Sequence, residues 1–340
     1  MQTVIGIFCI WVVSRLLGSL ARRLKQPAII GELFTGIVLG PSLIGHYYTF
    51  SSPFLGKMNV FGTALFLLTA GWAIKLSEVM RYKHVGLAVS MAGALVPFLI
   101  GYALGCWYPG LVGYDGQISP GMFAVFLGIA LSVSALPVIA RTLMDIGLYR
   151  TRIGIVTMSA VAIDDVLGWI CFTLMLSLFG HMGAGAQFNF FLPLVCYMAG
   201  VLIGEVDGPR GMRVKAAVES LVNNVFAPIV FGSTAIMLSF IQHFDLYLVL
   251  VLIAAASVGK ILGCASAALA MGLPQRESWA VGFAMNSRGA MMIILASLAW
   301  QLHLIGERLL IAVITMAVTT SLMSAPLIRY ALKGGNSPAV

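Results

Sequence analysis

The chain has few charged residues. Only 9% of its 340 residues are Asp, Glu, Lys or Arg, whereas an ordinary soluble domain carries roughly 25%. Long polar linkers are missing as well, and 60% of the residues are hydrophobic. The composition therefore excludes an ordinary soluble protein. It predicts one integral membrane domain over residues 1–340, without a soluble regulatory domain.

Several common site patterns are also missing. The five cysteines are scattered without C-x-x-C spacing, so they predict neither a disulfide framework nor a metal cluster. The five histidines fall at the ends of apolar runs or in loops, so none is placed to relay protons at mid-membrane. No cofactor is expected. The first apolar run lacks a cleavage site of the A-x-A type, so it is expected to stay in the membrane.

Long apolar runs make up most of the sequence. A helix needs about 20 apolar residues to cross a bilayer core, and runs of that length recur along the chain. The runs predict an all-α polytopic membrane protein with about eleven transmembrane helices, while residues 210–223 could add an amphipathic segment. The expected spans are 4–21, 28–45, 59–76, 85–107, 119–142, 153–179, 188–205, 223–241, 246–272, 278–300 and 307–330.

The basic residues, which give a net charge of +8, are distributed unevenly among the loops. Loops on one side of the expected membrane hold nearly all of them, while the other side holds only Lys57 and Arg308. This is the positive-inside pattern, and it places the N-terminus outside and the C-terminus in the cytoplasm. The basicity thus reports topology and gives no reason to expect a nucleic-acid partner.

Two pairs of motifs suggest internal symmetry. "TGIVLGP" at 35–41 is echoed by "AGVLIGE" at 199–205, and "LSVSALP" at 131–137 by "AMNSRGA" at 284–290. Transporters are often built from two such related halves. The first repeat would cover about residues 1–179 and the second about 188–335.

Four ionisable residues fall well inside the expected spans: Asp164, Asp165, Lys260 and Arg288. Each costs a few kcal/mol at the bilayer centre, so such residues usually mark a polar pathway or site. The alternative is an ion pair that only joins helices. Two adjacent acids, however, exceed what one lysine can neutralise.

Asp164 and Asp165 cannot both face one partner, because successive helix residues point about 100° apart. Lys260 is the natural partner of one of them. The other carboxylate, buried beside a like charge, could hold either a proton or a cation near neutral pH. Competition for one carboxylate is a physical basis for exchange.

Polar residues interrupt two of the expected spans. Ser132, Ser134 and Pro137 break the fifth, while Asn286, Ser287, Arg288 and Gly289 break the tenth. Broken helices expose carbonyl ends that can coordinate a cation, and Arg288 is placed to compensate the helix ends at its own break. Two plainer alternatives stay open. Pro137 could be a simple kink, and the two serines could bond to their own helix backbone.

Three long motifs resemble the monovalent cation:proton antiporters, in particular the branch with Kef-type and plant CHX-type exchangers. They are "QPAIIGELFTGIVLGPSLIG", "ALSVSALPVIARTLMDIGLYRTRIGIVTMSAVAIDDVLGW" and "MNSRGAMMIILASLAWQLHLIGERLLIAVITMAVTTSLMSAPLI". The resemblance implies an elevator-type, inverted-repeat fold in which two broken, crossing helices surround an aspartate site. It makes Asp165 the carboxylate that binds Na⁺ or K⁺ and H⁺ in turn, and Asp164 the acid paired with Lys260. It also implies a homodimer in a plasma membrane, such as the bacterial inner membrane, and electrogenic exchange.

The chain departs from that family pattern in length. About two spans expected between the aspartate helix and the helix of residues 188–205 have no counterpart. A regulatory nucleotide-binding domain would have to come from a separate subunit. Two other functions stay open: a transporter-like sensor or cation channel without coupled exchange, and an intramembrane aspartyl hydrolase. The hydrolase is disfavoured because its two carboxylates must face each other, which neighbours on one helix do not.

Overall fold

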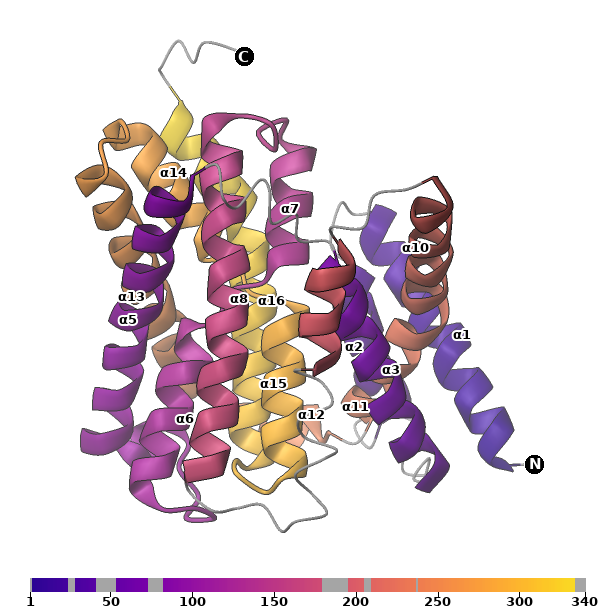
Figure 1. Cartoon of the computed structure of the whole chain (residues 1–340). Coiled ribbons are helices and arrows are strands. Elements are labelled where there is room, and N and C mark those ends of the chain that lie inside the picture. Colours follow the sequence, from indigo (N-terminus) through magenta and orange to yellow (C-terminus); the bar gives the residue numbers. More distant parts are fainter. Residues whose placement is uncertain are drawn as a thin grey trace. The chain divides into compact units, whose positions relative to one another are not determined.

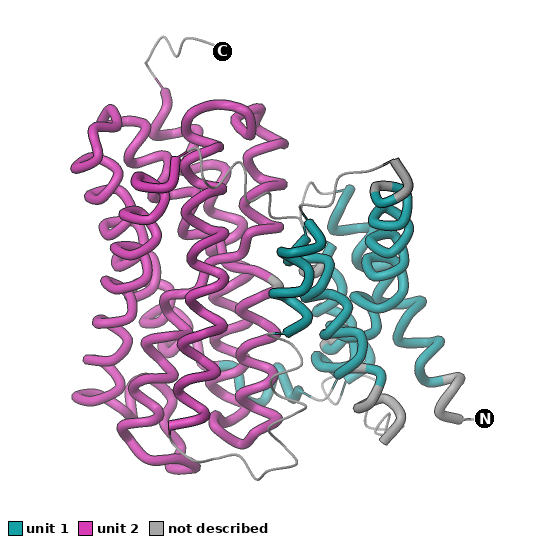
Figure 2. The backbone as a smooth tube through the Cα atoms, viewed as in Figure 1, with its two compact units in different colours: residues 1–75, 182–244 teal, residues 76–181, 245–340 magenta. Residues whose placement is uncertain are grey.

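Helices make up all regular secondary structure in the described part of the chain, as the apolar runs predict (Figure 1). The computed structural model describes residues 2–23, 28–40, 53–72, 82–178, 195–204, 209–236 and 238–333. Contacts divide the chain into two compact units (Figure 2). Unit 1 comprises Met1–Lys75 and Met182–Phe244, and unit 2 comprises Leu76–His181 and Asp245–Val340. Each unit thus combines one segment from each expected repeat. The repeat relation itself stays a prediction.

Six helical segments of the described residues are long and apolar enough to cross a membrane. Shorter apolar helices, such as Val195–Gly204, accompany them. Parts of the expected spans, including 41–45, 73–76 and 188–194, lie outside the described residues. The count of eleven therefore stays a prediction. The six segments are Lys83–Trp107, Pro120–Asp145, Arg152–Leu178, Arg213–Ile236, Leu246–Ala270 and Glu307–Leu332.

Unit 1 is held together by close helix approaches at small residues. A Cβ atom at Gly36 would lie only 2.2 Å from the backbone carbonyl of Ala235, so glycine is required where these two helices meet. Besides Val195–Gly204, the unit's helices are α1 (Gln2–Arg23), α2 (Ala28–Leu39), α3 (Pro53–Trp72), α10 (Pro209–Leu221), the π-helical turn η2 (Val222–Phe226), α11 (Ala227–Ile236) and α12 (Phe240–His243).

The eighth expected span, 223–241, has wrong boundaries. Helix α10 covers the segment expected to be amphipathic and continues through η2 into α11, so the helix begins at Pro209 and not at residue 223. In the π-helical turn, the backbone carbonyl of Asn224 accepts a bond from Trp11 Nε1 at 2.9 Å, and its side-chain oxygen lies 2.5 Å from Arg15 Nη1. Two bonds to α1 thus accompany the local change of helix type.

Unit 2 contains all four ionisable residues singled out above. Its α5 turns a narrow face of small residues inward and large apolar side chains such as Leu95 outward, which suits contact with lipid. The inward residues are Gly86, Val89, Ser90, Gly93, Pro97, Gly101 and Gly105. The unit's helices are α5 (Lys83–Trp107), the short η1 (Pro109–Val112), α6 (Pro120–Ser132), α7 (Leu136–Asp145), α8 (Arg152–Leu178), α13 (Leu246–Ala270), α14 (Gln275–Met285), α15 (Ala290–Gln301) and α16 (Glu307–Leu332).

Two of the expected spans are broken where the polar interruptions predict. The fifth divides into α6 and α7, and the tenth into α14 and α15. Pro137 lies in the first turn of α7, where a missing backbone N–H costs nothing, so it begins a new helix and does not merely kink one. Each break leaves free helix ends inside an apolar unit, and these ends need polar partners.

Candidate functional site: a crossing of two broken helices

The two breaks lie against each other within unit 2. The backbone N–H of Ala135 donates to the carbonyl of Ser287 at 3.2 Å, and Ser134 Oγ donates to the carbonyl of Met285 at 2.9 Å. The interruption of α6–α7 therefore crosses that of α14–α15. The resemblance to the antiporters predicts such a crossing. Hydrogen bonds between the two breaks supply partners for some of the polar groups at the crossing.

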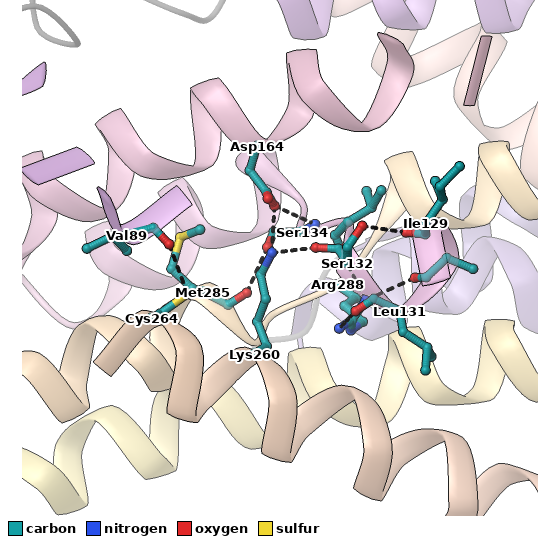
Figure 3. A network of polar contacts seen from close by, with 12 residues as sticks. Val89, Ile129, Leu131, Ser132, Ser134, Asp164, Lys260, Cys264, Met285 and Arg288 are labelled. Carbon is teal, nitrogen blue, oxygen red and sulfur yellow. Dashed lines mark hydrogen bonds and ion pairs between the residues drawn. The ribbon is translucent and has the colours of Figure 1, made fainter. Parts of the chain in front are cut away.

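Lys260, on α13, places its ammonium group at this crossing. Its Nζ lies 2.8 Å from Asp164 Oδ2, and the side chains of Lys260 and Asp164 are only 0% and 2% exposed. Lys260 Nζ also donates to the carbonyl of Ser132, and the backbone N–H of Ser134 donates to the same Asp164 oxygen at 3.0 Å (Figure 3). One carboxylate oxygen thus links α8, α13 and the break between α6 and α7.

Asp165 follows Asp164 on α8 and is equally buried, with 2% of its surface exposed. The helix turns its side chain about 100° away from that of Asp164. Lys260 is bound to Asp164 Oδ2. One acid of the pair thus contacts Lys260, while the adjacent acid projects in another direction; the division of roles between them stays a prediction.

Arg288 compensates helix ends at the opposite break, not at its own. Its Nη1 donates to the carbonyls of Ala130 and Val133 at 3.1 and 2.9 Å, and its Nη2 donates to that of Leu131 (Figure 3). The expectation that Arg288 serves its own break is therefore wrong. Its long side chain crosses over to the carbonyl end of α6, where a positive charge is favourable.

Three serines that the sequence analysis did not single out support the second break. On α16, Ser321 Oγ bonds to the carbonyl of Arg288 and Ser324 Oγ donates to that of Phe283 at 2.7 Å. On α13, Ser257 Oγ accepts from Asn286 Nδ2 at 3.1 Å. A serine inside an apolar helix usually bonds to its own backbone, so its sequence gives no sign of such a contact.

The serines of the first break differ in their contacts. Ser132 Oγ donates to the carbonyl of Ile129 at 2.8 Å, within its own helix. This is the alternative in which the serine bonds to its own helix backbone. Ser134 instead bonds across to the second break. Among the described residues, no group of three or more His, Cys, Asp or Glu side chains could hold a metal ion.

Comparison with known protein families identifies the family to which a chain with this crossing belongs. A profile of the family described as "Sodium/hydrogen exchanger, transmembrane" matches residues 11–196 and 192–332. The chain belongs to the sodium/hydrogen exchanger family. The matched segments contain both helix breaks together with Asp164, Asp165, Lys260 and Arg288, so the crossing lies in the part of the chain that this family shares.

Individual relatives of this exchanger-family chain agree with the profile. The chain is 28% identical to "Cation/H(+) antiporter 18" of Arabidopsis thaliana over 97% of its own length and 49% of that protein. It is 25% identical to "Na(+)/H(+)-K(+) antiporter GerN" of Bacillus cereus over 93% of each. The structure of the sodium proton antiporter MjNhaP1 from Methanocaldococcus jannaschii matches with a TM-score of 0.65 and 14% identity over 98% of both chains. That last likeness concerns the fold.

Lengths differ between the exchanger-family chain and its relatives. The chain spans about half the length of the Arabidopsis relatives it matches. The alignment to the first of them extends over 398 positions although the chain has 340 residues, so that relative contains internal segments with no counterpart here. The profile match divides at residues 192–196, between the aspartate helix and the helix Val195–Gly204. This is consistent with the two missing spans expected at that place.

Proposed function

We propose that this chain is a secondary active antiporter that exchanges Na⁺ or K⁺ for protons. The observation that carries the proposal is the buried Lys260–Asp164 pair at the crossing of two broken helices, next to a second buried carboxylate, Asp165. Membership of the sodium/hydrogen exchanger family and the names of the relatives support it. Asp165 would bind the cation and the proton in competition, while Asp164 stays paired with the lysine.

Several features of the proposal come from the resemblance and the loop charges. We infer a homodimer in a plasma membrane, with the N-terminus outside and the C-terminus in the cytoplasm, and exchange that moves net charge. A separate regulatory subunit is part of the same hypothesis. The aspartyl-hydrolase alternative is disfavoured because Asp164 and Asp165 are neighbours on one helix and a lysine binds Asp164.

A transporter-like sensor or channel is the second candidate, favoured by the two spans without a counterpart. Both candidates predict cation binding, but only the antiporter couples cation movement to proton movement. The difference is therefore measurable in a reconstituted system.

Purified protein in liposomes with an internal pH dye tests the proposal. Pulses of sodium and of potassium, each at two membrane potentials, should move protons against the cation flux, and a dependence on potential would show electrogenic exchange. If neither cation moves protons, the antiporter proposal fails. Cation flux without proton flux would favour a channel.

A further inference from the structure

The two helix ends at the crossing differ in the charge of their partners. The carbonyls of residues 130–133, at the end of α6, accept bonds from the cationic groups of Arg288 and Lys260. The carbonyls of residues 283, 285, 287 and 288, at the end of α14 and in its break, accept bonds from three serine hydroxyls and one backbone amide. Two cationic side chains thus bind the carbonyls at the end of α6, whereas these four carbonyls of the second break have neutral partners.

Two side-chain oxygens at the second break are buried without a hydrogen-bond partner among the described residues. They are Asn286 Oδ1 and Ser287 Oγ, on residues that are 1% and 0% exposed. The amide nitrogen of Asn286 is held by Ser257, which fixes the plane of the side chain. An unsatisfied buried oxygen is unfavourable, so both oxygens are candidate ligands for an ion or group that binds at the break during function.

The chemistry of this position selects the kind of occupant. The carboxyl end of a helix carries partial negative charge and favours cations. Amide and hydroxyl oxygens can replace part of the water shell of an alkali ion, as carbonyl oxygens do in ion-selective pores. A phosphate or carboxylate would be repelled by the carbonyl oxygens of the second break. Dedicated calcium sites usually include several carboxylates, which these two residues do not supply.

We propose that Asn286 Oδ1 and Ser287 Oγ form a subsite for the partly dehydrated monovalent cation, at the carboxyl end of α14. The inference rests on the proposed exchange of a cation and extends it. The α14–α15 break then contributes ligands of its own in addition to supporting the aspartate site, and Asn286 and Ser287 help to determine which alkali ion is accepted.

Ser287→Ala is the sharpest test, because it removes only an oxygen that makes no bond in the described structure. Asn286→Ala tests the second ligand. Ser297→Ala is the matched control, since Ser297 is another buried serine whose hydroxyl donates to Ile293 of its own helix at 2.7 Å. Ser287→Thr restores the hydroxyl.

Two measurements are needed for each variant. The first is the KM for Na⁺ and for K⁺ in the proteoliposome assay. The second is the thermal midpoint in detergent with sodium, potassium or choline chloride, since an ion that binds only the folded state stabilises it more as the ion concentration rises above the Kd. We expect Ser287→Ala and Asn286→Ala to raise KM for the preferred cation by about tenfold or more and to reduce the cation-dependent shift of the midpoint. Ser297→Ala and Ser287→Thr should keep both values.

The outcomes separate this inference from the proposed function. If the parent exchanges cations while Ser287→Ala and Asn286→Ala keep its KM values and its midpoint shift, the subsite is wrong and the exchange stands. A loss of maximal rate that is equal for all cations, with the midpoint shift unchanged, would also overturn it, since it would indicate a structural role only. If the parent moves no protons but the midpoint shift depends on Asn286 and Ser287, the subsite stands and the antiporter proposal fails.

Discussion

Lys260 Nζ lies 2.8 Å from Asp164 Oδ2, and both side chains are almost fully buried. Removing two charges from water costs free energy that their attraction barely returns, so such a pair is weak evidence of a gain in stability. Its position argues for another role. The pair fixes one acid of α8 at the crossing, directly beside Asp165, the carboxylate that we propose binds the transported ion.

Replacing Lys260 with alanine should strongly destabilise the protein, because it leaves the Asp164 charge buried without its cation. We expect a loss of about 3–5 kcal/mol in the free energy of unfolding. Denaturation of the purified protein in detergent measures this loss. The matched control is Arg141→Ala, which breaks an exposed 3.8 Å ion pair with Asp145 and should cost no more than about 1 kcal/mol.

A double variant tests whether the loss comes from the stranded charge. Lys260→Met combined with Asp164→Asn removes both charges, so it should be more stable than Lys260→Met alone. If the double variant is less stable than the parent by the sum of the losses of Lys260→Met and Asp164→Asn, the two residues do not act as a pair.

Asp165→Asn should abolish cation-dependent proton flux while the protein remains folded and inserted, since an amide cannot exchange a proton for a cation. Asp145→Asn is the control, because Asp145 is an exposed carboxylate at the end of α7. Proteoliposome flux and the thermal midpoint are measured together. Cation-driven proton movement in Asp165→Asn, at a rate near that of the parent, would remove Asp165 from its assigned role.

Arg288→Lys keeps the charge but should still weaken unit 2. The guanidinium group bonds three carbonyls of residues 130, 131 and 133 in a fixed fork, whereas an ammonium group on a flexible stem cannot match that geometry. The loss should be about 1–3 kcal/mol, with a lower thermal midpoint. Arg308→Lys is the control, because Arg308 is half exposed. Equal midpoints for Arg288→Lys and the parent would show that the fork is dispensable.

Hydrophobic runs and polar interruptions were sufficient to predict most of unit 2. The expected span 85–107 corresponds to a helix at Lys83–Trp107, and both breaks occur at the predicted residues. The pairing of Lys260 with one of the two aspartates also follows from the sequence, because a buried lysine needs an acid. The sequence could not show which oxygen the lysine contacts, nor that it also bonds the carbonyl of Ser132.

The failures have identifiable physical causes. Helix α10 is too polar for a hydropathy criterion, so the start of the eighth span was placed too late. The reach of Arg288 depends on the crossing of two segments about 150 residues apart, which local patterns do not contain. Ser321 also bonds to Ala317 of its own helix, as serines in apolar helices usually do, and only the packing of α16 against α14 reveals the contact of Ser324 with Phe283.

A surface ion pair gives a prediction of pH dependence. Asp245 caps the start of α13, accepting from the backbone N–H of Leu248 at 3.0 Å, and its carboxylate pairs with Arg308. These two contacts lower the pKa of Asp245 below its ordinary value, with the backbone bond as the larger cause. A depressed folded-state pKa means that the contribution to stability is present above the ordinary value and is lost as the pH falls through the folded-state value.

Asp245→Asn isolates the charge in this contribution, because asparagine is as good a helix cap as aspartate. We expect the parent to exceed the variant by no more than about 1 kcal/mol at neutral pH, since the pair is partly exposed. The difference should shrink as the pH falls from about 4 towards 2 and should also be smaller in high salt. Thermal midpoints of both proteins in detergent, measured over this pH range, test the assignment. A difference that stays constant down to the lowest pH would mean that Asp245 does not contribute through its charge.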